Sequence, residues 1–242
     1  MAGTLYVVAT PLGNLEDITL RALRVLREVD LIATEDTRRT RILLEHYQIH
    51  TSLTSLYDHN EAEKAPILVR RLQEGVNLAL VSEAGTPLIS DPGYRLVQLA
   101  ISGEIPVSPI PGPSAVVAML SVAGLPTDRF VFEGFLPKKP GKRRRRLETL
   151  GEEPRTLIFY ESPRRVCELL SEILARWGNR RVVLGRELTK KFEAILRGHI
   201  TEVLAQLEKH PPQGEVTLMV EGLTAVGPPA ASHALDDRSD LC

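Results

Sequence analysis

Nine consecutive residues, 138–146, carry enough positive charge to bind a polyanion. The segment is KKPGKRRRR, so seven of its nine side chains are cations. Like charges this close repel one another unless a polyanion relieves them, and phosphates would do so with salt-sensitive affinity. The segment predicts RNA binding, with a solvated loop or helix face as the alternative. The predicted RNA contacts are Lys138, Lys139, Lys142, Arg143, Arg144, Arg145 and Arg146.

Three loops rich in glycine and proline have the composition of a small-ligand site. They follow short apolar runs that end at Ala9, Val81 and Ile110. Gly85 would let a ligand approach the backbone closely, and Ser114, at an expected helix start, offers a hydroxyl and unpaired backbone N–H groups. Such loops suit a small zwitterionic nucleoside, and ordinary strand-to-helix turns are the alternative. The sequence contains neither GxGxxG nor GxxxxGK[ST], so a nucleotide-like ligand would be held without these motifs.

Two polar runs could contact a substrate. Residues 57–61 (YDHNE) precede an expected helix, and Asp58 or His59 could reach a substrate from there. Residues 186–193 (RELTKKFE) lie between two expected strands and could form a wall of the site. A plain helix start and surface ion pairing are the respective alternatives.

The elements that would position these residues alternate between strand and helix over the first 124 residues. This order predicts an α/β fold with a mostly parallel sheet covered by helices. Ligands bind beyond the carboxyl ends of such strands, so the three loops should meet at one edge. Asp91 followed by proline predicts the start of a helix that runs to Gly103. The expected strands are residues 5–9, 31–33, 78–81 and 105–110.

The second half has strands that follow one another directly, which predicts a mixed sheet. The change falls near residues 111–114. The expected organisation is an N-terminal α/β domain, a C-terminal α/β domain and a flexible tail, at residues 1–114, 115–224 and 225–242. The expected strands of the second domain are residues 130–135, 156–160, 182–185, 192–197 and 215–220.

Composition limits the class of protein. The net charge is −1 and 43% of residues are hydrophobic, which is typical of a globular chain and not of a uniformly basic nucleic-acid binder. Any RNA binding must therefore come from the local cluster. The two cysteines have no metal-ligand spacing, so we expect no metal. With neither a signal peptide nor a membrane span recognisable, we expect a cytoplasmic protein.

Eight segments, in this order along residues 4–223, resemble those of the tetrapyrrole methylase superfamily. Together they are similar to one branch of it, the ribosomal RNA small subunit methyltransferase I group. The matching segments are residues 5–19 (LYVVATPLGNLEDIT), 33–38 (ATEDTR), 57–61 (YDHNE), 85–93 (GTPLISDPG), 111–115 (PGPSA), 159–165 (FYESPRR), 186–193 (RELTKKFE) and 220–222 (VEG).

The resemblance implies a two-domain methyltransferase of the non-Rossmann class III fold. It implies S-adenosylmethionine bound between the domains, usually in a homodimer. The implied reaction is 2′-O-methylation of a decoding-region cytidine (cytidine 1402) in 16S rRNA, either as naked rRNA or in the assembled small ribosomal subunit. By position in the family pattern, the cofactor residues would be Leu12, Gly85, Thr86, Ile89, Ser114 and Ala115, with Tyr160 and Glu221 approaching from the second domain.

Two residues depart from related patterns. Glu83 stands where the branch usually has aspartate, which puts a fine geometric role of that acid in doubt. Thr86 stands where corrin and porphyrin methylases usually have aspartate, which weakens a small-molecule reading. A tetrapyrrole or other small molecule nevertheless remains an alternative substrate, and a non-enzymatic RNA-binding assembly factor is a second alternative.

Methyl transfer to a ribose would require a group that orients the hydroxyl or takes its proton. The candidates are Glu187, Lys190 and Glu193, with Asp58 behind them. A lysine base needs a lowered pKa, which burial or the neighbouring Lys191 could provide.

Overall fold

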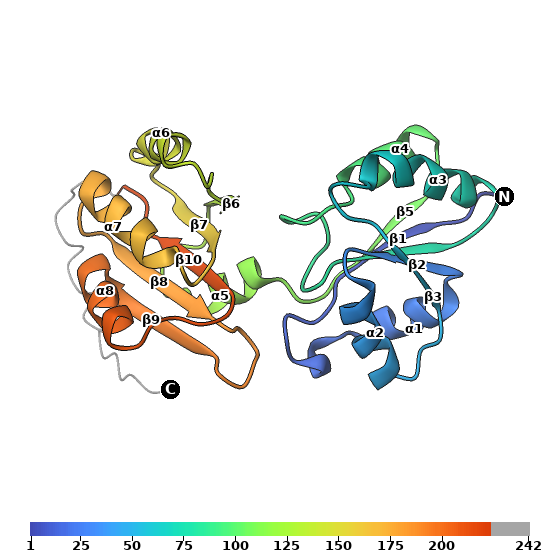
Figure 1. Cartoon of the computed structure of the whole chain (residues 1–242), viewed down its shortest axis with the longest axis horizontal. Coiled ribbons are helices and arrows are strands. Elements are labelled where there is room, and N and C mark those ends of the chain that lie inside the picture. Colours follow the sequence, from blue (N-terminus) through green and yellow to red (C-terminus); the bar gives the residue numbers. More distant parts are fainter. Residues whose placement is uncertain (224–242) are drawn as a thin grey trace, which may run out of the picture.

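The computed structural model describes residues 1–223 and contains two sheets, each covered by helices (Figure 1). The expected tail, residues 225–242, lies outside the described residues. All pairings in the first sheet are parallel, in the order β3-β2-β4-β1-β5. Its strands are β1 (Leu5–Val8), β2 (Leu31–Thr34), β3 (Ser52–Ser55), β4 (Leu78–Val81) and β5 (Val107–Ile110).

The central strands β2 and β4 of the first sheet are buried on both faces because helices cover each side. On β4, Ala79 and Val81 pack toward α1 and α2, whereas Leu78 and Leu80 pack toward α3 and α4. This arrangement explains the continuous apolar runs in the sequence. The helices are α1 (Leu20–Glu28), α2 (Thr37–His46), α3 (Glu61–Gln73) and α4 (Tyr94–Ser102), with a short 3-10 helix η1 (Leu15–Asp17) before α1.

The second sheet is mixed, as expected, in the order β6-β7-β10-β8-β9. β6 pairs in parallel with β7, and the other pairings are antiparallel. Helix α5 covers one face of this sheet, while α6, α7 and α8 cover the other. The elements are α5 (Ala115–Ala123), β6 (Phe130–Phe135), α6 (Pro140–Leu150), β7 (Thr156–Glu161), α7 (Val166–Trp177), β8 (Arg181–Arg186), β9 (Ala194–His199), α8 (Ile200–Lys209) and β10 (Val216–Val220).

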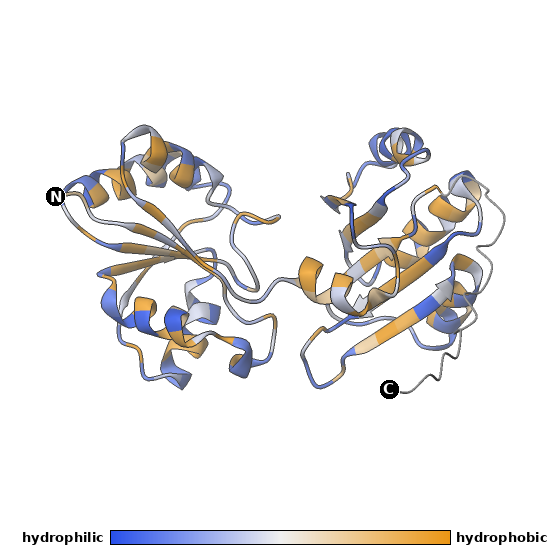
Figure 2. Ribbon diagram, turned by 180° about the vertical axis from the view of Figure 1, so that it is seen from behind, coloured by the Kyte–Doolittle hydropathy of each residue, from blue (hydrophilic) through white to orange (hydrophobic). Residues whose placement is uncertain are grey.

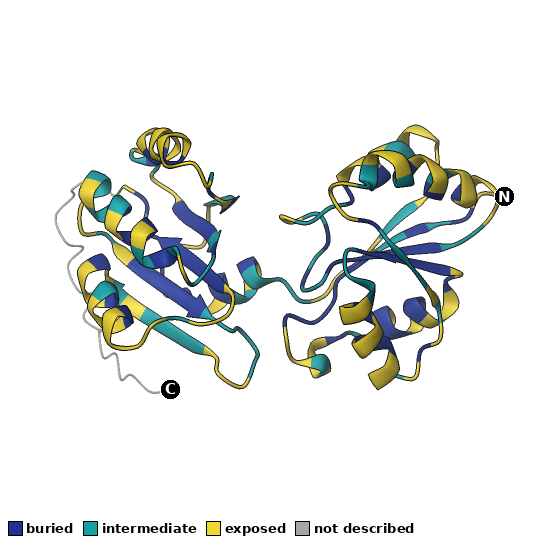
Figure 3. Ribbon diagram, in the orientation of Figure 1, coloured by how far each residue is buried: buried dark blue, intermediate teal, exposed yellow. Residues whose placement is uncertain are grey.

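A short segment, residues 111–114, joins the last strand of the first sheet to α5 (Figure 1). The apolar side of α5 packs on the second sheet through Val116, Met119 and Leu120. Buried residues form separate clusters around the two sheets (Figure 3), and hydrophilic residues are interspersed along the helices other than α5, which is almost wholly hydrophobic (Figure 2). The domain limits at 114 and 115 stay a prediction.

The structure corrects the sequence analysis at two elements. Residues 52–55 form an edge strand that the polar sequence did not reveal. Residues 140–146 of the basic segment lie in a regular helix, α6, as one of the two alternatives allowed. Helix α4 begins at Tyr94 after Gly93, so Asp91 is not its cap. Within residues 1–223, none of the helices combines the length and apolar character needed to cross a membrane.

Candidate functional site

The three loops predicted to meet do so because β4, β1 and β5 are neighbours in the first sheet. Backbone hydrogen bonds of 2.9 Å in both directions join Thr10 to Gly85. The hydroxyl of Thr86 donates to the carbonyl of Pro113 at 3.1 Å. The three loops are therefore tied into one rim at the carboxyl ends of the strands.

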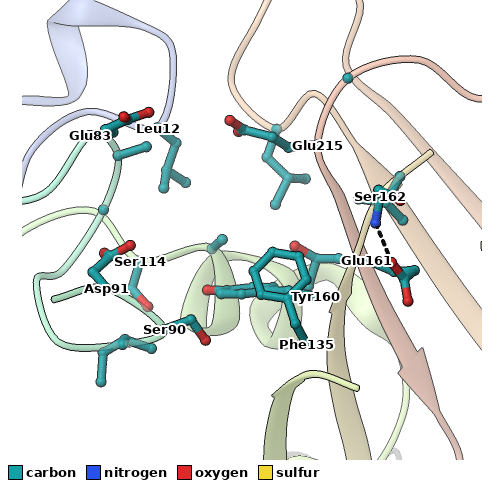
Figure 4. A pocket seen from close by; sticks show the side chains of 18 of the residues that line it. Leu12, Glu83, Ser90, Asp91, Ser114, Phe135, Tyr160, Glu161, Ser162 and Glu215 are labelled. Atoms are coloured by element: carbon teal, nitrogen blue, oxygen red, sulfur yellow. Dashed lines mark hydrogen bonds between the residues drawn. The ribbon is translucent and has the colours of Figure 1, made fainter. Parts of the chain in front are cut away.

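A cavity of about 490 Å³ lies between this rim and the second sheet (Figure 4). The volume is within the range of small-ligand sites. The second sheet closes it with Phe135, Tyr160 and the start of β10 around Glu215. Seven of the eight predicted cofactor residues line the cavity: Leu12, Gly85, Thr86, Ile89, Ser114, Ala115 and Tyr160.

The eighth predicted cofactor residue, Glu221, lies elsewhere. The cavity meets β10 at its beginning, residues 214–217, whereas Glu221 follows its last residue. Five residues of extended strand separate Val216 from Glu221, which is about 16 Å. The carboxylate of Glu221 instead lies 3.9 Å from Arg181. Because β10 runs antiparallel to β7, its first residues lie beside Tyr160 and Glu161 at the cavity, and its last residues lie away from it.

Gly85 has a backbone conformation that requires glycine and leaves the backbone open to the cavity. Its φ is +83°, a conformation that residues with a side chain rarely adopt. A Cβ atom there would lie 3.1 Å from the side chain of Leu12, which also lines the cavity. Any larger residue would therefore strain the rim and narrow the site.

Asp91 is a cavity residue that the sequence analysis missed. Burial, together with the charge of the nearby Glu35, raises the pKa of its carboxyl to about 7, although a hydrogen bond from Ser82 acts to lower it. Glu35 and Glu83 line the same cavity, and burial also raises the pKa of Glu35. The segment Ser90–Gly93 belongs to a family motif and so could have pointed to Asp91, but an aspartate followed by proline is also typical of a helix start.

These acids make one side of the cavity negative. Figure 4 shows Glu83 and Asp91 on the side of the first sheet, with Glu215 across from them. A ligand with positive charge would offset their repulsion and lower the pKa of Asp91. The cavity therefore favours a cationic ligand.

The longer side chain of Glu83 has an observed partner. Its carboxylate accepts a hydrogen bond from Arg39 of α2 at 2.5 Å. The extra methylene relative to aspartate thus supports an ion pair between the second loop and α2, while Glu83 still lines the cavity.

Tyr160 is the principal aromatic contact of the second sheet with the cavity. Burial raises the pKa of its hydroxyl to about 12, so it stays protonated and can donate a hydrogen bond at neutral pH. Its ring extends from β7 toward the loops that carry Asp91 and Ser114 (Figure 4). Phe135 lies beside it, with 5.7 Å between the ring centroids.

None of the three catalytic candidates lines the cavity, although Leu188 in the same loop does. Lys190 donates hydrogen bonds to Glu187 at 3.0 Å and Glu215 at 3.3 Å. Burial alone would lower the pKa of Lys190, but the two carboxylates outweigh it and raise the pKa. The lowered pKa that a lysine base would need is therefore absent, because the loop surrounds Lys190 with acids.

The other two candidates hold the same loop in place. Burial acts to raise the pKa of Glu187, but the hydrogen bond from Lys190 and other partners lower it overall. Glu193 is exposed and accepts a hydrogen bond from the backbone of Thr189 at 2.6 Å. The hydroxyl of Thr189 accepts from the backbone of Asn14 at 3.2 Å, which ties this loop to the first rim loop. Asp58, the further candidate, is exposed and lies near Glu35 and Asp91.

The seven predicted RNA contacts differ in how far their side chains are buried. Arg143 is 2% exposed and pairs with Glu172 at 2.9 Å and with Glu168. Its assignment as an RNA contact is therefore corrected: the side chain attaches α6 to α7. Arg146 is half-exposed and bonded twice to Glu133. The remaining predicted contacts are exposed: Lys138, Lys139, Lys142, Arg144 and Arg145.

S-adenosylmethionine fits the residues of this cavity. Its sulfonium and ammonium groups match the carboxylates, and its own carboxylate matches the start of α5, where the Ser114 side chain makes no capping bond. The glycine at position 85 allows close approach of the ligand to the backbone.

Comparisons with known proteins agree with this geometry. The sequence pattern of the family described as Tetrapyrrole (Corrin/Porphyrin) Methylases matches residues 4–204. The protein named ribosomal RNA small subunit methyltransferase I from Escherichia coli O157:H7 is 54% identical to this chain, over 91% of this chain and 78% of that protein. The protein of the same name from Pseudomonas aeruginosa is 52% identical over 93% and 80%.

Solved structures confirm the fold. A uroporphyrin-III C-methyltransferase from Thermus thermophilus in complex with S-adenosylhomocysteine aligns with a TM-score of 0.63 at 19% identity, covering 90% of this chain and 97% of that one. A diphthine synthase aligns with a TM-score of 0.68 at 16% identity, covering 90% of each. This chain therefore belongs to the tetrapyrrole methylase family, in its ribosomal RNA small subunit methyltransferase I branch, and its cofactor is S-adenosylmethionine.

Proposed function

We propose that this protein methylates the ribose 2′-hydroxyl of a decoding-region cytidine in 16S rRNA. The names of the relatives at 50–54% identity support a small-subunit rRNA substrate. The choice of a ribose oxygen of a cytidine as the methyl acceptor rests on the family resemblance. The observation that carries the proposal is an acidic cavity suited to the cofactor, close to a helix with exposed cations.

Within this proposal, the site acts mainly by binding and alignment. S-adenosylmethionine supplies an electrophilic methyl group on a sulfonium centre. The carboxylates of Asp91 and Glu83 would hold the positively charged groups of the cofactor, while the start of α5 at Ser114 and Ala115 would receive its carboxylate. Tyr160 stays protonated and closes the cavity from β7. Fixing two reactants in line supplies a large part of the rate of a displacement reaction.

The loop of residues 186–193 has a positioning role in this proposal. Glu187, Lys190 and Glu193 do not reach the cavity, and their contacts fix the backbone that presents Leu188 to it. We therefore propose that these three residues support the wall of the site and do not transfer the proton.

The exposed cations of 138–146 would hold rRNA phosphates. Phosphate contacts position RNA without reading its sequence, so the folded RNA would supply the specificity. A small-molecule substrate gives these cations no role. We place this activity in the cytoplasm with the ribosomal subunits. We also propose a homodimer, which sedimentation of the full chain would test.

The decisive experiment offers three acceptors to the protein with methyl-labelled S-adenosylmethionine. These acceptors are unmethylated small ribosomal subunits, free 16S rRNA and a porphyrinogen. We expect label on one ribose of the rRNA, located by nuclease mapping. Label on the porphyrinogen alone would establish the small-molecule alternative. Cofactor-independent RNA binding without transfer would favour the assembly factor.

A further inference from the structure

A groove of about 430 Å³ lies between strand β6 and helix α6, next to the cofactor cavity. Its basic residues are Lys142, Arg145 and Arg146 of α6. Phe135, the last residue of β6, lines both the groove and the cavity, so the two spaces meet at its ring. Among the lining residues described for the two spaces, no other residue connects the basic helix with the cavity.

The cations of the groove lie together because of helical spacing. Lys142, Arg145, Arg146 and Thr149 follow positions i, i+3, i+4 and i+7, which share one face of a helix. Arg146 is already bonded to Glu133 at 2.6 and 2.8 Å. Within residues 1–223, the ion pairs of α6 are those of Arg143 and Arg146. Lys142 and Arg145 therefore keep charge available for an anion.

Phe135 has the position of a stacking platform. It is 57% exposed, so one side of its ring is open to a ligand. It pairs in register with Tyr160, and a bulge at Gly134, with φ of +61°, sets its direction. A Cβ atom on Gly134 would lie 2.8 Å from the hydroxyl of Ser90, so the bulge sits where the two halves touch.

An exposed aromatic ring beside two available cations has the chemistry that binds single-stranded nucleic acid. Bases stack on aromatic side chains, and neighbouring cations hold the backbone phosphates. The ring faces a cavity that holds the methyl donor, so a nucleotide stacked there would bring its ribose to the cavity mouth.

We propose that Phe135 stacks on the base of the methylated nucleotide, while Lys142 and Arg145 hold the adjacent phosphate in the groove. The inference rests on the proposed rRNA methylation and names the residues that set the register of the RNA. The nucleotide must be unpaired, because a base within a duplex has no free face for stacking.

The first test compares Phe135→Leu with Phe130→Leu, a matched change at the other end of the same strand, where the ring is 41% exposed. Methyl transfer to unmethylated small ribosomal subunits is measured together with cofactor affinity by calorimetry. For Phe135→Leu we expect kcat/KM for the subunit to fall about ten-fold or more, well beyond any change in cofactor affinity, because leucine keeps the cavity wall apolar. Phe135→Trp should retain activity, and Phe130→Leu should behave as wild type.

The second test reverses charge at two adjacent exposed positions of α6. Arg145 lines the groove and Arg144 does not. Arg145→Glu should lower kcat/KM about ten-fold more than Arg144→Glu, which changes only the general attraction for RNA. Melting temperatures of both variants verify that they are folded.

Three results would overturn the inference while leaving the proposed function intact. They are equal losses for Arg144→Glu and Arg145→Glu, wild-type transfer by Phe135→Leu, and a parallel loss of cofactor affinity in Phe135→Leu. If the wild-type protein labels no rRNA at all, the proposed function itself fails and the inference falls with it.

Discussion

The carboxyl of Asp91 should make cofactor binding depend on pH. Its pKa is about 7 in the protein without ligand, so it is largely neutral below that pH and charged above it. A cationic ligand prefers the charged form. We expect the affinity for S-adenosylmethionine, measured by calorimetry, to increase as pH rises from about 6 to 8. Asp91→Asn should bind more weakly and show no such increase.

The same group predicts how stability changes with pH. The folded pKa lies above the unfolded value of 3.8, so the folded state binds the extra proton between these two values. The stability due to this group is complete below about pH 4 and is lost as pH rises through about 7. Above pH 7 without cofactor, Asp91→Asn should therefore melt at a higher temperature than wild type. The control is Asp128→Asn, an exposed side chain, and equal pH profiles for both variants would contradict the assignment.

Arg143 should stabilise the fold without contacting RNA. Removing a buried partner leaves its carboxylates uncompensated, so Arg143→Ala should lower the free energy of unfolding by about 3 kcal/mol. Arg144→Ala, the exposed neighbour, should change it by no more than about 0.5 kcal/mol. Urea unfolding measures both values. Equal stability of the two variants would show that the pairs with Glu168 and Glu172 contribute little.

At the level of elements, the loop of residues 186–193 supports the cavity wall. The side chain of Lys190 lies against Gly13 and pairs with two acids. The backbone of Glu187 and Thr189 has positive φ. Lys190→Ala should reduce kcat and weaken cofactor binding together, because Leu188 loses its support. The pH profile of kcat should keep its shape, because Lys190 does not line the cavity.

Two further variants separate this positioning role from catalysis. Lys190→Arg should restore most activity, because an arginine can pair with the same acids. Lys191→Ala removes an exposed lysine that lies over the ring of Phe192 and should have no effect. A complete loss of turnover in Lys190→Ala with normal cofactor affinity, not restored by arginine, would return Lys190 to the list of bases.

For the molecule as a whole, the cofactor should join the two halves. The cavity takes residues from both sheets, so the ligand contacts both. At one hundred times its dissociation constant, S-adenosylmethionine should stabilise the fold by about 2.7 kcal/mol. Hydrogen exchange should slow both in the loop after β4 and at the start of β10. Gly85→Val should abolish the stabilisation, because its Cβ would meet Leu12. Protection confined to one half would contradict a ligand held between the sheets.

Much of the fold was predictable because local patterns agree with it. Alternating apolar strands and amphipathic helices predicted the parallel sheet, and directly successive strands predicted the mixed one. The edge strand β3 escaped because Ser52–Ser55 is polar and only partly buried. The basic segment gave no apolar periodicity, so its helix depends on packing through Leu147, Leu150 and the buried Arg143.

Patterns in the sequence are enough to predict the two-sheet α/β class and the rim of loops after β1, β4 and β5, and the family motifs identify seven residues that line the cavity. Charge states and side-chain directions depend on packing between distant segments, so they follow from the folded structure alone. Whether a cation is an RNA contact or an internal tie depends on what packs against it, as Arg143 and Arg145 show. The pKa values of Asp91 and Lys190 likewise depend on burial and on carboxylates brought from distant parts of the chain.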